Sequence, residues 1–128
     1  MADVVVADTD VVIDFLRGAE PGATLVRALL QEGRLRFTPV TAFELRRGAD
    51  FVPRRDLLMQ LLTRRTYPLD LESALRAGEL AAVLKAQGRE IGPADALQAG
   101  FCLRHGVPLA TRNRRHFDQV EGLQLVDL

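Results

Sequence analysis

Residues 4–18, VVVADTDVVIDFLRG, decide how the chain is expected to fold. The run VVVA at 4–7 is short, apolar and β-branched, which is typical of a strand buried on both faces of a parallel sheet. Apolar residues then recur at helical spacing over 11–16, and Gly18 is placed to end that helix. Asp8 therefore stands between an apolar strand and an apolar helix, beside the core, where a carboxylate needs a partner.

The same alternation of strand and helix continues along the chain. Further strands are expected at 35–40, 107–111 and 122–126, while 67–71 is either a short strand or a connection. Helices are expected at residues 11–18, 23–33, 42–49, 53–65, 72–88 and 94–106, and a polar turn at 112–117. No hairpin signal appears. We therefore predict one α/β domain over residues 1–128, a three-layer α/β/α sandwich around a short, mostly parallel central sheet.

The charge of the chain does not by itself indicate a nucleic-acid-binding protein. Seventeen basic residues balance seventeen acidic ones in the 128 residues. Sixteen of the bases are arginines, and many are clustered: Arg46–Arg47, Arg54–Arg55, Arg64–Arg65 and Arg112 with Arg114–Arg115. Arginine makes bidentate contacts to phosphate, but solvated helix faces explain each pair equally well.

The sequence also bears on the compartment. Cys102 is the only cysteine, so no internal disulfide can form, which fits a reducing environment. The apolar start carries no basic residues and is interrupted by acids, unlike a signal peptide or a membrane span. We expect a cytoplasmic protein that makes no contact with a membrane.

Three acids are candidates for a metal site. Sites in open parallel sheets form beyond the carboxyl ends of the strands, and Asp8 follows the first strand. Glu44 and Asp95 stand near the starts of two predicted helices, although Thr41 and Glu44 also have the spacing of a capping box. A divalent cation makes a buried carboxylate cluster tolerable, and oxygen ligands favour Mg²⁺ or Mn²⁺ over zinc.

Three segments together resemble one family. They are ADTDVVIDFLRG at 7–18, TAFELRRG at 41–48 and IGPADALQAGFCLRHGVPLATRNRRHF at 91–117. They resemble PIN-domain proteins, specifically VapC-type toxins of type II toxin–antitoxin pairs. The resemblance implies a metal-dependent endoribonuclease in which Asp8, Glu44 and Asp95 hold Mg²⁺ and a metal-activated water cleaves RNA, leaving a 5′-phosphate and a 3′-hydroxyl. It also implies a homodimer and a VapB-like antitoxin that covers the site.

The resemblance is incomplete on one side of the expected site. A fourth position, often polar or acidic in the family, falls on Asn113, and a further one, often acidic, falls on His116. The number of metal ions therefore stays open. Asp10, Thr111, Arg112 and Asn113 are further candidates to support the ligands or orient the substrate, although cap and turn chemistry explains them about as well.

Two other functions stay open at this point. DTDVV matches the start of haloacid-dehalogenase-type phosphatases, with Asp8 as nucleophile, but the only lysine is Lys85 and no adjacent acid pair follows. Alternatively, the chain is a binding module that keeps the fold while its acids are vestigial. The sequence does not name the RNA. The apolar face of 53–62 is either part of the core or an interface between two copies.

Overall fold

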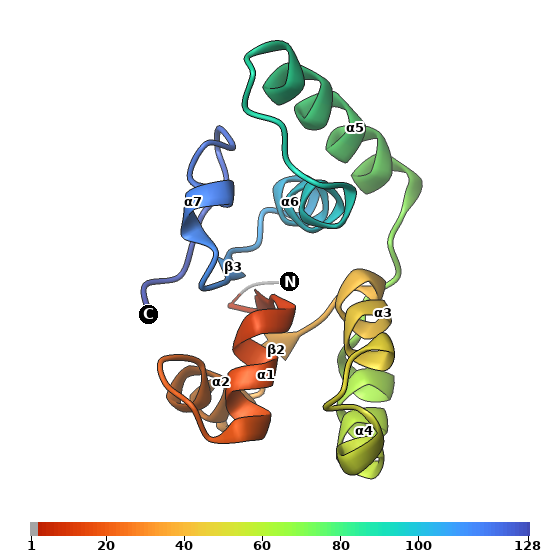
Figure 1. Ribbon diagram of the computed structural model, residues 1–128, viewed down its shortest axis with the longest axis vertical. Helices are drawn as coiled ribbons and strands as arrows, with labels where there is room; N and C mark the ends of the chain where they lie inside the picture. Colours follow the sequence, from red (N-terminus) through yellow and green to blue (C-terminus); the bar gives the residue numbers. More distant parts are fainter. Residues whose placement is uncertain (1–2) are drawn as a thin grey trace.

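A small parallel sheet lies at the centre of the computed structural model, which describes residues 3–128 (Figure 1). Strand β1 (Val5–Ala7) lies between β2 (Leu35–Arg36) and β3 (Leu109–Ala110), and both pairings are parallel. Single parallel bridges, Phe37 to Thr66 and Leu109 to Leu125, extend the two edges. The bridge at Thr66 lies just before the predicted segment 67–71 and the bridge at Leu125 lies within 122–126, so neither segment forms a full strand.

Each face of the sheet is covered by its own layer of helices. Val5 and Ala7 belong to one core cluster, whereas Val4 and Val6 belong to the other, as the two-residue period of a strand requires. Helices α1 (Thr9–Arg17), α2 (Gly22–Gln31), α3 (Pro39–Arg47) and α4 (Arg55–Arg65) lie on one side, and α5 (Leu71–Ala86), α6 (Pro93–His105) and α7 (Arg114–Phe117) on the other (Figure 1). The predicted three-layer α/β/α sandwich is confirmed.

The ends of α1 follow the sequence signals. Asp8 is its N-cap, and the Asp8 carboxylate accepts a hydrogen bond from the Thr9 N–H at 2.9 Å. Gly18 ends the helix in the left-handed conformation, with φ 66°. The strand and the first helix are therefore joined without a loop, which places the Asp8 carboxylate at the edge of the sheet.

The predicted capping box of α3 is wrong. The helix begins at Pro39 with Thr38 as N-cap, because proline has a preset φ and lacks the N–H that the first turn leaves unpaired. The Thr41 hydroxyl is instead buried and donates to the Ala7 carbonyl oxygen at 3.3 Å. Glu44 is thus not needed to cap the helix and is free to make contacts elsewhere.

Three smaller expectations also change. The segment predicted as one helix over 53–65 opens with a 3-10 turn, Val52–Arg54, before α4. On α4, Leu58, Leu61 and Leu62 are buried in the core while Leu57 is 40% exposed, so the core takes most of the face considered for an interface. The turn at 112–117 contains the short helix α7. Within residues 3–128, no helix combines the length and apolarity needed to cross a bilayer.

The close contact of α5 with α6 generates a stability prediction. A Cβ at Gly100 would lie 2.6 Å from the Ser73 carbonyl oxygen and 2.7 Å from the Ala77 Cβ, whereas a Cβ at Gly78 would meet nothing within 4 Å. We expect Gly100→Ala to lower the free energy of unfolding by about 1–3 kcal/mol, because overpacking forces the helices apart. Gly78→Ala, the matched control on α5, should raise it by about 0.5–1 kcal/mol. Urea unfolding measures both, and equal midpoints would contradict the close packing.

Candidate active site

The Asp8 carboxylate is the centre of a buried hydrogen-bond network beyond the end of β1. Besides the Thr9 N–H, it accepts a hydrogen bond from the Thr111 hydroxyl at 2.8 Å, and the Gln98 amide nitrogen lies 3.4 Å from it. Asp8 is only 7% exposed. Three elements distant in sequence, β1, α6 and the end of β3, therefore converge on this one carboxylate.

Burial makes the charged form of Asp8 costly. It raises the pKa of this carboxyl from 3.8 to about 6; the Thr111 hydrogen bond opposes the rise and the negative charge of Asp10 adds to it. Burial also raises the pKa of Asp10, which accepts hydrogen bonds from Thr111 at 3.3 Å and from the Arg112 N–H at 3.1 Å. The Thr111 hydroxyl thus lies between two carboxylates and satisfies them only in part.

The charge of the nearby Arg112 opposes the rise in the pKa of Asp10, but its ion pair is with Asp14. The Arg112 guanidinium lies 3.2 Å from the Asp14 carboxylate, which also accepts from the Gly22 N–H at 3.0 Å. The Asp14 side chain is buried, and Arg112 is its ion-pair partner. Within residues 3–128, Asp8 has no basic side chain at ion-pair distance, so its charge lacks a cation.

Glu44 and Asp95 approach this network from two sides. Glu44 accepts a hydrogen bond from the Thr9 hydroxyl at 2.6 Å, next to Asp8 in the chain. Asp95, in the first turn of α6, lies 3.0 Å from the His116 Nδ1 atom, and that atom is 2.9 Å from the Asn113 amide nitrogen. Asn113 in turn donates its backbone N–H to the Thr111 hydroxyl at 3.0 Å.

The predicted ligands are therefore linked through other side chains, but they do not point at one ion. In the part of the chain that the structure describes, no three His, Cys, Asp or Glu side chains are placed to hold a metal as they stand. Asp8 and Asp10 share the Thr111 hydroxyl, whereas Glu44 faces Thr9 and Asp95 faces His116. The donor set, carboxylates without a cation, still matches the chemistry of a hard divalent ion.

Sequence reasoning missed Gln98. Its side chain is 1% exposed, its amide nitrogen donates to the Thr41 hydroxyl at 2.9 Å, and its carbonyl oxygen accepts from the Thr38 hydroxyl. Gln98 therefore ties α6 to α3 directly behind Asp8. The available signal was a long polar side chain inside the apolar stretch ALQAGF, where burial requires every polar atom to be paired.

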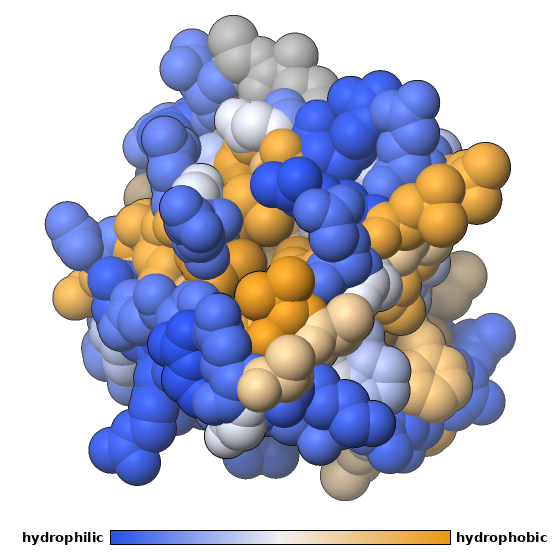
Figure 2. Space-filling model, turned by 90° about the horizontal axis from the view of Figure 1, so that it is seen from above, coloured by the Kyte–Doolittle hydropathy of each residue, from blue (hydrophilic) through white to orange (hydrophobic). Residues whose placement is uncertain are grey.

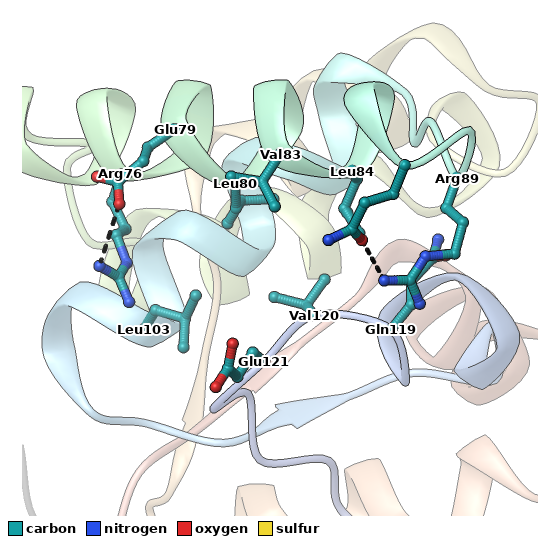
Figure 3. A pocket seen from close by; sticks show the side chains of 11 residues that line it. Arg76, Glu79, Leu80, Val83, Leu84, Arg89, Leu103, Gln119, Val120 and Glu121 are labelled. Carbon is teal, nitrogen blue, oxygen red and sulfur yellow. Dashed lines mark hydrogen bonds and ion pairs between the residues drawn. The ribbon is translucent and has the colours of Figure 1, made fainter.

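A hollow of about 190 Å³ elsewhere on the molecule is not part of this network. It lies between α5 and the segment after α7, and Leu80, Val83, Leu103 and Val120 point into it (Figure 3). Its charged rim includes Arg76 and Glu79, which form an ion pair at 4.0 Å. None of the candidate ligands lines it.

The raised pKa of Asp8 generates a pH prediction for stability without metal. Below about pH 4 the carboxyl is protonated whether the chain is folded or unfolded. As the pH rises from about 4 through about 6, the unfolded chain loses this proton while the folded chain either retains it or buries the charge. The free energy of unfolding therefore falls by up to about 3 kcal/mol. We expect Asp8→Asn to be more stable than wild type at pH 8 in EDTA and equal to it near pH 4.

Urea unfolding across this pH range measures the difference. Asp118→Asn, which changes an exposed acid, is the control and should follow the wild-type profile. Parallel profiles for wild type and Asp8→Asn would contradict the buried, uncompensated carboxylate.

The chain is similar to known proteins in sequence and in fold. A family model described as the PIN domain matches residues 5–123. The chain is 32% identical to a tRNA(fMet)-specific endonuclease VapC of Shigella flexneri, over 94% of each chain. The fold is similar to that of VapBC from Salmonella typhimurium, solved bound to DNA (TM-score 0.81, 22% identity, 97% of each chain), and of VapBC-1 from nontypeable Haemophilus influenzae (TM-score 0.75, 27% identity, 97% of each chain).

These matches cover nearly the whole chain and favour the nuclease over the haloacid-dehalogenase-type phosphatase. Ribonucleases of this family are typically metal-dependent, in agreement with the oxygen-rich network around Asp8. The chain belongs to the PIN-domain family and, within it, to the VapC ribonuclease toxins of VapBC toxin–antitoxin systems.

Proposed function

We propose that this chain is an Mg²⁺-dependent endoribonuclease whose ion is held by Asp8, Glu44 and Asp95, with Mn²⁺ as a substitute. The buried Asp8 carboxylate carries the proposal. It lies at the end of the central strand with its pKa raised by burial and with no basic partner among residues 3–128. A divalent cation would neutralise that charge where the protein supplies no cation of its own.

The side chains of this chain divide the work. When bound, Mg²⁺ lowers the pKa of a water and stabilises negative charge on the attacked phosphate. Asp8 is fixed by Thr111 and Gln98, so it offers a preset oxygen to the ion. Asp10 receives the Arg112 N–H and supports the loop after β3. Asn113, uncharged, orients water or phosphate without adding a ligand charge.

Two of the proposed ligands have other partners in this structure. Glu44 accepts a hydrogen bond from the Thr9 hydroxyl, and Asp95 lies 3.0 Å from the His116 Nδ1 atom. Both side chains are partly exposed, and they would hold the ion together with Asp8 in exchange for these partners.

Substrate and partners follow from the family. The Shigella flexneri relative is a tRNA(fMet)-specific endonuclease, so transfer RNA is the first substrate to test. Solved relatives are VapBC complexes, and we propose a VapB-like antitoxin for this chain as well. A homodimer is also proposed, and light scattering tests it.

The proposal predicts the effect of removing the ligands. Asp8→Asn and Asp95→Asn should each lower RNA cleavage by at least about a hundredfold, because charge on the phosphate loses its stabilisation. Calorimetric titration should show weaker Mg²⁺ binding in both variants. Glu72→Gln, which changes an exposed acid in the first turn of α5, is the matched control and should act as wild type. Sequencing of RNA ends measures the cleavage.

Two results would overturn the proposal. Full activity of Asp8→Asn, or of wild type in EDTA, would exclude the metal scheme. A wild-type chain that neither binds Mg²⁺ nor cleaves RNA above background would be a binding module that has kept the fold.

A further inference from the structure

We propose that the α3–α4 hairpin is the surface on which RNA docks beside the site. Arg46, Arg47 and Arg55 neutralise backbone phosphates there, and Phe43 stacks on an unpaired base. This inference rests on the proposed function, since it names the docking surface of the same substrate. It assigns a role to arginine clusters that the metal site leaves unexplained.

The arginines of the hairpin are not paired with acids in the part of the chain that the structure describes. Among residues 3–128, none of the exposed Arg46, Arg47, Arg54 and Arg55 is within ion-pair distance of an acid. The nearby Asp50 is already bound by Arg17, at 2.8 Å. The hairpin therefore presents a net positive surface on a chain whose total charge is zero.

Aromatic rings hold these guanidinium groups in place. The guanidinium carbons of Arg46 and Arg55 lie 5.0 and 5.8 Å from the centre of the Phe51 ring, which is buried. That of Arg47 lies 5.5 Å from the centre of the Phe43 ring. A ring restricts an arginine without cancelling its charge, so the cations are ordered and still available to phosphates.

Phe43 connects this surface to the site. Its side chain is 65% exposed, although it is one of only six phenylalanines in the chain. It directly precedes Glu44, whose carboxylate reaches the residue beside Asp8. An exposed ring flanked by arginine is the arrangement on which unpaired bases stack in single-stranded RNA. A base stacked on Phe43 would hold the RNA on the helix that also carries Glu44.

The opposite side of the molecule offers a contrast. Helix α5 exposes Leu71, Leu75 and Val83, and Figure 2, which looks onto the α5 side, shows apolar surface among hydrophilic side chains. Its arginine Arg76 pairs with Glu79, and Arg104 of α6 pairs with Glu72. These two arginines are thus paired with acids, whereas Arg46, Arg47 and Arg55 of the hairpin are not, within the described residues.

Fluorescence anisotropy tests the surface, with a labelled, unstructured RNA of about 16 nucleotides. An Asp8→Asn background with Mg²⁺ prevents cleavage. Replacing Arg46, Arg47 and Arg55 together by Gln should weaken binding at least about tenfold and reduce the slope of log affinity against log salt by about 2. Arg76→Gln with Arg104→Gln is the control and should change neither. Urea midpoints confirm that the variants fold.

Phe43 is tested separately because stacking does not depend on charge. Phe43→Ala should weaken RNA binding by about tenfold with an unchanged salt slope, and Phe43→Trp should restore it. If the RNA affinity and its salt slope are unchanged in both the arginine variant and Phe43→Ala, the proposal is overturned. The hairpin would then be a surface for a protein partner. Such a result, combined with Mg²⁺-dependent cleavage by wild type, would leave the proposed function intact. If RNA binding depends on the hairpin residues but the wild-type chain does not bind Mg²⁺, only the proposed function would be overturned.

Discussion

The burial of one carboxylate at the end of a central strand governs the rest of this structure. Asp8 joins β1 to α1 and is 7% exposed, so it cannot rely on solvent to stabilise its charge. The fold surrounds it with neutral donors, Thr9, Thr111 and Gln98, and no basic side chain of residues 3–128 lies at ion-pair distance from it. Neutral donors hold the carboxylate in position but leave its charge uncompensated. That combination is suited to a divalent cation.

The smallness of the sheet serves this arrangement. The three strands are only two or three residues long, so they form few hydrogen bonds with one another. The two helical layers supply most of the buried surface. Polar side chains behind the site therefore have to fix the layers to one another. Gln98 does so by pairing with Thr38 and Thr41, which ties α6 to α3 across the end of β1. The contact that stabilises the fold is also the contact that orients Asp8.

The surroundings of the arginines differ between parts of the molecule. Arg17, Arg76, Arg104 and Arg112 lie against acids, and their charges are compensated within the fold. On the α3–α4 hairpin, guanidinium groups lie over the rings of Phe43 and Phe51 and stay uncompensated. A neutral chain thereby acquires a local positive surface beside a negative site. Net charge alone would not indicate it.

The sequence alone determined the layers and the neighbourhood of the site. Strong periodicity over 4–18 gave a buried strand and a helix, and alternation along the chain gave a parallel α/β fold, because these signals are local. The predicted start of α3 was wrong, because the helix begins at Pro39 and not after a cap at Thr41. Only the tertiary structure decided which polar groups meet. Gln98, Thr111 and Asp8 are far apart in the sequence, and their hydrogen bonds depend on how the layers pack, which no local pattern records.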